Sequence, residues 1–99
     1  MPGGWWRFWR RRPRLAGVRV VVYTRAACPL CDHAAAFLER ERRSLGFALE
    51  YVDIANDVEL TRRHGDWVPV VEVDGKVRFR GAVNPVLWGR LVTALGRRG

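Results

Sequence analysis

The sequence is poor in cysteine, with only two among its 99 residues, and two cysteines cannot build the disulfide framework of a small secreted domain. No apolar run approaches the roughly 20 residues that a membrane-spanning helix needs. The N-terminus does not resemble a secretory signal, because arginines interrupt each of its apolar stretches. We therefore expect a cytoplasmic protein, in which a close cysteine pair is typical of catalysis or metal binding rather than structural cross-linking.

The net charge of +8 is concentrated at the start of the chain. Residues 1–17 contain five arginines and no acidic residue, so they supply most of that charge. Prolines and glycines interrupt any strand or helix pattern in this segment, which also contains the aromatic residues Trp5, Trp6, Phe8 and Trp9. We expect residues 1–16 to be a flexible basic tail and residues 17–99 to form one domain.

The composition of this tail is compatible with three roles. Aromatic rings and guanidinium groups together suit the headgroup region of an anionic membrane, which indicates peripheral membrane contact. The same residue types suit single-stranded nucleic acid, the partner that we favour least. A disordered leader with no binding role explains the composition equally well.

Both cysteines lie in the stretch Cys28-Pro29-Leu30-Cys31, where a strand pattern gives way to a helix pattern. Residues 19–24 are rich in valine, as in a strand covered on both faces, and residues 29–45 have helical periodicity. The N–H groups of a helix N-terminus, together with the nearby Arg25, favour the thiolate form of Cys28. This pattern predicts thiol–disulfide exchange, in which one cysteine attacks a substrate disulfide and the other resolves the mixed disulfide.

The rest of the sequence predicts three further strands and two further helices. Residues 49–54 form a strand pattern, and a short helix follows up to His64. An Asp74-Gly75 pair between two β-branched runs is a strong hairpin signal, and Asn84-Pro85 has the chemistry of a helix start. The order β-α-β-α-β-β-α predicts an α/β fold, a four-stranded mixed sheet flanked by helices.

The helical periodicity also predicts which side chains enter the core. For the first helix these are Leu30, Ala34, Phe37, Leu38 and Leu45. For the last helix they are Val86, Leu87, Leu91, Val92 and Leu95. We further expect Trp88 to pack in the core and both His33 and His64 to be solvent-exposed helix residues.

A Cys-Pro-x-Cys turn after the first strand, followed by Val68-Pro69 ahead of a hairpin, resembles the glutaredoxins over residues 17–95. The similarity is greatest to small bacterial glutaredoxin-like proteins. It implies a thioredoxin fold in which Cys28 is the nucleophile and Cys31 is the resolving cysteine. It also implies that Pro69 is a cis-proline facing the sulfurs, and that the main chain of Val68 pairs with the bound peptide or glutathione. Arg25 stands where many glutaredoxins have a lysine that contributes to the glutathione carboxylate site.

Two regions differ from the glutaredoxin pattern. Glutaredoxins commonly follow the hairpin with Gly-Gly-x-Asp, which holds the γ-glutamyl end of glutathione, whereas this chain has Gly81-Ala82-Val83-Asn84. Ala82 adds a side chain where close approach is needed, and Asn84 removes a carboxylate that pairs with an ammonium group. Leu30 replaces the tyrosine that is frequent between the cysteines. These differences concern glutathione binding and leave dithiol exchange intact.

We interpret the chain as a glutaredoxin-like thiol–disulfide oxidoreductase that reduces protein or glutathione mixed disulfides. We expect no resident cofactor, with glutathione as a candidate electron donor. The expected substrate-binding residues are Arg25, Pro29, Leu30, Trp67, Val68, Pro69, Gly81 and Asn84. Trp67 has an alternative role, in which it only covers its loop.

Other readings of the cysteine pair remain open. A zinc site needs four ligands, and the chain offers Cys28, Cys31, His33 and His64 at most. Some glutaredoxins bridge an iron–sulfur cluster between two chains through the first cysteine and glutathione. A third alternative is a non-catalytic adaptor that keeps the thioredoxin fold as a scaffold.

Overall fold

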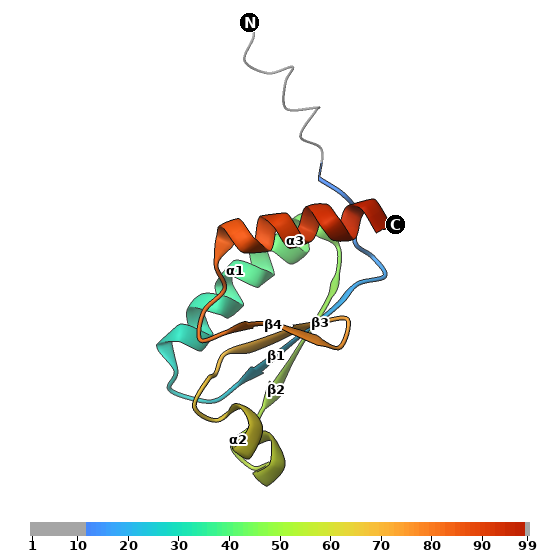
Figure 1. Ribbon diagram of the computed structural model, residues 1–99. Helices are drawn as coiled ribbons and strands as arrows, with labels where there is room; N and C mark the ends of the chain where they lie inside the picture. Colours follow the sequence, from blue (N-terminus) through green and yellow to red (C-terminus); the bar gives the residue numbers. More distant parts are fainter. Residues whose placement is uncertain (1–11, 99) are drawn as a thin grey trace, which may run out of the picture.

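A four-stranded sheet with the strand order β2-β1-β3-β4 organises the chain, of which the computed structural model describes residues 12–98. The strands are β1 (Arg19–Thr24), β2 (Ala48–Asp53), β3 (Val70–Val73) and β4 (Lys76–Arg80), and the helices are α1 (Pro29–Leu45), α2 (Val58–His64) and α3 (Pro85–Arg98). Helices α1 and α3 cover one side of the sheet, and α2 lies on the opposite side (Figure 1). The predicted element order and α/β class are confirmed.

The strand pairing follows from the connections. β1 and β2 are parallel because α1 carries the chain back across the sheet, and β1/β3 and β3/β4 are antiparallel. Asp74 and Gly75 join β3 to β4 with positive φ angles of 51° and 84°, the left-handed conformation that a two-residue hairpin of type I′ requires. The hairpin predicted from the Asp-Gly pair is therefore confirmed.

The main core lies between the sheet and the two helices that cover it. Alternate strand residues, Val20 and Val22 on β1 with Val71 and Val73 on β3, point into this core because strand side chains alternate between faces. Trp88 on α3 is buried among them, as predicted. A second, smaller cluster of buried residues surrounds the cysteine turn and consists of Cys31, Ile54 and Val68.

The faces of the helices differ from the prediction at three positions. On α1 the buried residues are Cys31, Ala34, Leu38 and Leu45, whereas Leu30 is 52% exposed. On α3 the buried residues are Trp88, Val92 and Leu95, whereas Val86 and Leu87 are exposed. The reason is geometric: one residue turns a helix by about 100°, so the rotation that points Cys31 inward leaves Leu30 outside, and the one that points Trp88 inward leaves Val86 and Leu87 outside.

The segment before β1 packs on the helices from residue 12 onward. The guanidinium of Arg12 donates two hydrogen bonds to the Glu41 carboxylate at 2.7 and 3.1 Å. Leu15 is buried, and its N–H donates to the carbonyl of Leu45 at 2.7 Å. Arg12 and Leu15 are therefore bound to α1, although both lie in the segment that was expected to be a flexible tail. The rest of the predicted tail, with its proposed membrane or nucleic-acid contacts, lies outside the described residues.

No helix within residues 12–98 combines the length and the apolar character needed to cross a membrane.

Candidate active site

The two cysteines lie at the start of α1 and form a disulfide with a Cα–Cα distance of 5.2 Å. Cys28 is the N-cap of the helix, and its Sγ accepts a hydrogen bond from the Cys31 N–H at 3.2 Å. Cys28 is partly exposed, whereas Cys31 is only 3% exposed. The turn therefore leaves Cys28 partly accessible to solvent and keeps Cys31 inside.

The segment that precedes β3 lies against the cysteine turn. Val68 is buried with Cys31 in the smaller cluster, and the Val68–Pro69 peptide bond is cis. The N–H of Gly81 donates to the carbonyls of both Trp67 and Pro69 at 2.9 Å, which fixes this segment beside the end of β4. Gly81 has a φ of 80°, a conformation that favours glycine. Val68, Pro69 and Gly81 are thus brought together at one edge of the site.

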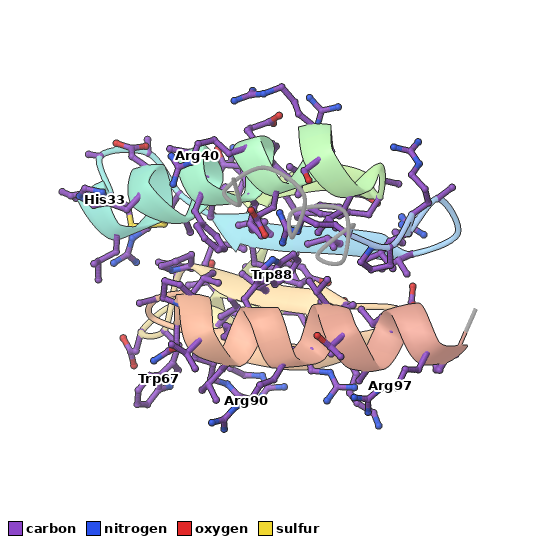
Figure 2. The ribbon with its side chains drawn as sticks, turned by 90° about the horizontal axis from the view of Figure 1, so that it is seen from above. His33, Arg40, Trp67, Trp88, Arg90 and Arg97 are labelled. Carbon is purple, nitrogen blue, oxygen red and sulfur yellow. A yellow bond between two sulfur atoms is a disulfide. The ribbon has the colours of Figure 1, made fainter. Side chains whose placement is uncertain are left out.

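Arg25 lies between β1 and the cysteine turn, and Trp67 lies between α2 and Val68. The guanidinium of Arg25 donates to the carbonyl of Gly65 at 3.0 Å, and Trp67 is 58% exposed. Trp67 lies toward the same end of the molecule as His33 (Figure 2). An exposed indole at this position is free to contact a substrate.

Pro29 and Leu30 lie within the cysteine turn, and Asn84 directly precedes α3. Leu30 and Pro29 are both exposed. The Asn84 Oδ1 accepts hydrogen bonds from the N–H groups of Val86 at 2.9 Å and Leu87 at 3.1 Å, so this side chain caps α3. The position that the resemblance assigned to substrate binding is thus engaged in holding a helix start.

Comparison of the sequence with known protein families identifies the family of this chain. Residues 19–88 match the glutaredoxin-like domain family (DUF836). The chain belongs to this family. The solution NMR structure of protein Ne2328 from Nitrosomonas europaea is 29% identical to this glutaredoxin-like domain, with a TM-score of 0.67 over 75% of this chain and 89% of Ne2328.

Two thioredoxins share the fold of the glutaredoxin-like domain at lower identity. Oxidised thioredoxin from Plasmodium falciparum is 17% identical with a TM-score of 0.56, over 83% of this chain and 86% of the thioredoxin. Thioredoxin from Fasciola hepatica is 19% identical with a TM-score of 0.54, over 86% of this chain and 84% of that protein. The predicted thioredoxin fold is confirmed. No curated protein sequence is significantly similar to the chain.

His64, at the end of α2, was predicted to be exposed, and this prediction is wrong. Its side chain is only 4% exposed, its ring centroid lies 4.7 Å from that of Tyr23, and neither ring nitrogen has a hydrogen-bond partner among the described residues. Burial lowers the pKa of His64, and so do the charges of Arg63 and Arg80, while Glu72 opposes them. A seven-residue helix shows too little periodicity for the sequence to reveal this burial.

Main-chain carbonyls at the end of α2 bind Arg25 and Trp67, two of the residues expected to bind substrate. The carbonyl of His64 accepts the Trp67 N–H at 2.8 Å, and the next carbonyl, that of Gly65, accepts Arg25. The backbone that holds Arg25 and Trp67 therefore includes the residue with the buried imidazole, His64.

We expect the domain to lose stability as the pH falls below the ordinary histidine pKa of 6.5. Below that value the unfolded chain takes up a proton that the native His64 resists, because the pKa is lower in the fold. The stabilising contribution is thus complete above pH 6.5 and declines on acidification toward the native pKa, by at most about 1.4 kcal/mol per pH unit. Urea unfolding at a series of pH values measures this slope.

Two variants make the pH experiment specific to His64. The His64→Phe variant removes the titration, so its stability should change less than that of the wild type between about pH 7 and 5. The exposed His33 provides the control, because His33→Gln removes a histidine without disturbing the packing of His64 on Tyr23. Equal slopes for wild type and His64→Phe would show that His64 is not the titrating group.

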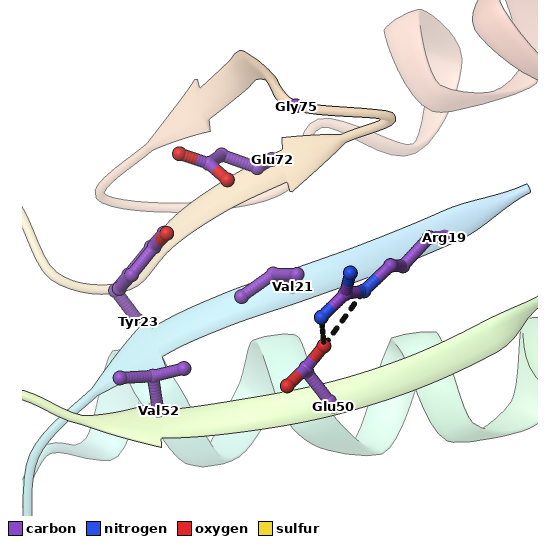
Figure 3. Close-up of a pocket in the computed structure, with 7 residues that line it drawn as sticks. All are labelled: Arg19, Val21, Tyr23, Glu50, Val52, Glu72 and Gly75. Atoms are coloured by element: carbon purple, nitrogen blue, oxygen red, sulfur yellow. Dashed lines mark hydrogen bonds and ion pairs between the residues drawn. The ribbon is translucent and has the colours of Figure 1, made fainter.

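A hollow on the sheet face opposite α1 and α3 has a volume of about 220 Å³ (Figure 3). Arg19 donates to the Glu50 carboxylate across it, with the Nε contact at 2.8 Å. Burial and the nearby Glu72 carboxylate raise the pKa of Tyr23, which lines the same hollow. Neither cysteine lines it, so it lies apart from the dithiol.

Within residues 12–98, no three His, Cys, Asp or Glu side chains are grouped so that they hold a metal ion. The four candidate zinc ligands therefore do not come together in the described part of the chain.

Proposed function

We propose that this glutaredoxin-like domain is a thiol–disulfide oxidoreductase that reduces protein disulfides or glutathione mixed disulfides. The observation that carries the proposal is the pairing of a partly exposed Cys28 with a buried Cys31 at the first turn of α1. The exposed sulfur is accessible to a substrate, and the buried sulfur is held within bonding distance of it.

The reaction proceeds by two successive exchanges. The Cys28 thiolate attacks one sulfur of the substrate disulfide, which forms a mixed disulfide and releases the other substrate sulfur as a thiolate. Cys31 then loses its proton to solvent and attacks the Cys28 sulfur, which releases the second substrate thiolate. The substrate gains two electrons, and the two cysteines lose two electrons as they form their disulfide. Two glutathione molecules or a dithiol reductase return the pair to the reduced form.

The helix start supports the first of these steps. The Cys31 N–H points at the Cys28 sulfur at 3.2 Å, and the positive end of the α1 dipole lies at the same place. Both features stabilise a negative charge on Cys28 and therefore favour the attacking thiolate.

Replacing Cys31 with serine tests the scheme directly. Cys31→Ser retains the attacking sulfur but lacks the resolving one, so it should accumulate a covalent mixed disulfide when mixed with a disulfide substrate. Intact-mass analysis should show the added mass of one substrate half, and dithiothreitol should remove it. The wild type should show no such adduct at the end of the reaction. Absence of any adduct on Cys31→Ser, under conditions in which the wild type turns over, would contradict the two-cysteine scheme.

A further inference from the structure

An apolar groove of about 220 Å³ lies beside the cysteine turn. Leu30, Ala34 and Phe37 line it from α1. Ala82 and Val83 line it from the segment before α3, and Pro85 lines it from the first position of α3. Leu30 also forms part of the cysteine turn, so the groove adjoins the dithiol. Half of its side chain is exposed, although Leu30 was predicted to enter the core.

The lining of the groove contains no acidic side chain. His33 is the only ionisable residue that lines it, and no carboxylate does so. Arg40 follows Phe37 by three residues on α1, so the two side chains are neighbours on the helix surface, and the Arg40 guanidinium carbon lies 5.9 Å from the Phe37 ring centroid. Figure 2 shows Arg40 on the same helix as His33. Arg40 forms no ion pair with any residue in 12–98. The groove therefore combines an apolar interior with an unpaired cation beside it.

These features suit a polypeptide better than glutathione. The ammonium group of glutathione needs an anion, yet the groove lining offers none, and Asn84 Oδ1 is occupied by two N–H groups of α3. An extended polypeptide needs main-chain partners, and the N–H and C=O of Val68 form no backbone hydrogen bond within residues 12–98. An apolar side chain that enters such a groove is removed from water, which favours its binding.

We propose that the groove binds an apolar side chain of a polypeptide substrate, next to the substrate disulfide, and that an adjacent acidic residue pairs with Arg40. This inference rests on the proposed function and adds the class of substrate. Because Arg40 lies beside an apolar groove, the site favours peptides that have both an apolar and an acidic residue over peptides that are only acidic.

The test compares the reduction of three cysteine-containing peptides, each supplied as a mixed disulfide with 2-mercaptoethanol. The first has Leu-Glu beside the cysteine, the second has Leu-Lys, and the third has Ser-Lys. The glutathione mixed disulfide and hydroxyethyl disulfide, a small neutral disulfide, complete the set. For the wild type we expect kcat/KM for the Leu-Glu peptide to exceed the values for the Ser-Lys peptide and the glutathione mixed disulfide at least about tenfold.

Charge reversal on α1 separates the groove from general electrostatics. Arg40→Glu should reverse the preference between the Leu-Glu and Leu-Lys peptides, because a carboxylate then stands beside the groove. Arg43→Glu makes the same charge change on the same helix, away from the groove lining, and should leave the preference as in the wild type. Ala82→Lys should lower the rate for both leucine-containing peptides, because it places a charged side chain in the apolar interior.

The outcomes distinguish this inference from the proposed function. If the wild type reduces hydroxyethyl disulfide but treats all peptides and glutathione alike, the substrate assignment is wrong and the oxidoreductase activity stands. If the wild type reduces none of the disulfides, both are wrong. A full-length variant with serine in place of Trp5, Trp6, Phe8 and Trp9 tests whether the N-terminal segment of the chain occupies the groove. If it reduces the Leu-Glu peptide at least about tenfold faster than the wild type, the N-terminal segment occupies the groove and the inference is overturned.

Discussion

Cys28→Ser is expected to abolish disulfide reduction, with a loss of at least about a hundredfold in rate. The hydroxyl that replaces the sulfur is not ionised at neutral pH, and it cannot form the mixed disulfide through which the electrons pass. The remaining thiol, Cys31, is buried, so a substrate disulfide does not reach it. Reduction of hydroxyethyl disulfide with a coupled thiol donor measures the rate.

The control for this loss is the integrity of the fold. Serine accepts hydrogen bonds at a helix N-cap at least as well as cysteine, so the Cys31 N–H that now donates to Cys28 keeps a partner. The circular dichroism spectrum of Cys28→Ser should therefore match that of the reduced wild type. A variant that is folded and fully active would favour the adaptor alternative, in which the cysteines carry no chemistry.

Much of the fold was predictable because its decisive signals are local. The valine run of β1 requires a strand covered by other elements, and Asp74-Gly75 supplies two residues that tolerate positive φ at the one place where a tight hairpin needs them. The Cys-Pro-x-Cys turn indicates a helix start by itself, because proline fits the first turn of a helix. Each of these signals depends only on neighbouring residues in the sequence, so it can be recognised without knowledge of the tertiary structure.

The details that failed depend on the third dimension. Leu30 and Cys31 are adjacent and both apolar, and only the position of the sheet decides which of them turns inward. His64 is buried because Tyr23, from a strand 41 positions earlier, packs against its ring. The apolar groove at Leu30 was not foreseen for the same reason: its two walls come from α1 and from the segment around the start of α3, which only the fold brings together.

Trp88→Ala is expected to destabilise the domain by about 3–5 kcal/mol, a large part of the total stability of a small domain. Trp88 is 2% exposed, and its ring contacts those of Phe37, Phe47 and Phe79 at centroid distances of 5.6 to 6.2 Å. Alanine would leave a cavity among three aromatic rings. The midpoint of urea unfolding, followed by circular dichroism, measures the loss.

Two further variants separate packing from hydrogen bonding. The Trp88 Nε1–H donates to the Glu41 carboxylate at 2.7 Å, and Trp88→Phe removes this bond while it retains most of the ring. Because Arg12 still pairs with Glu41, we expect Trp88→Phe to cost less than Trp88→Ala, and the difference reports the cavity. Trp67→Ala removes an equally large but mostly exposed side chain, so it should change the free energy of unfolding by less than about 1 kcal/mol. If Trp67→Ala proved as destabilising as Trp88→Ala, the loop before β3 rather than the α3 face would carry the core.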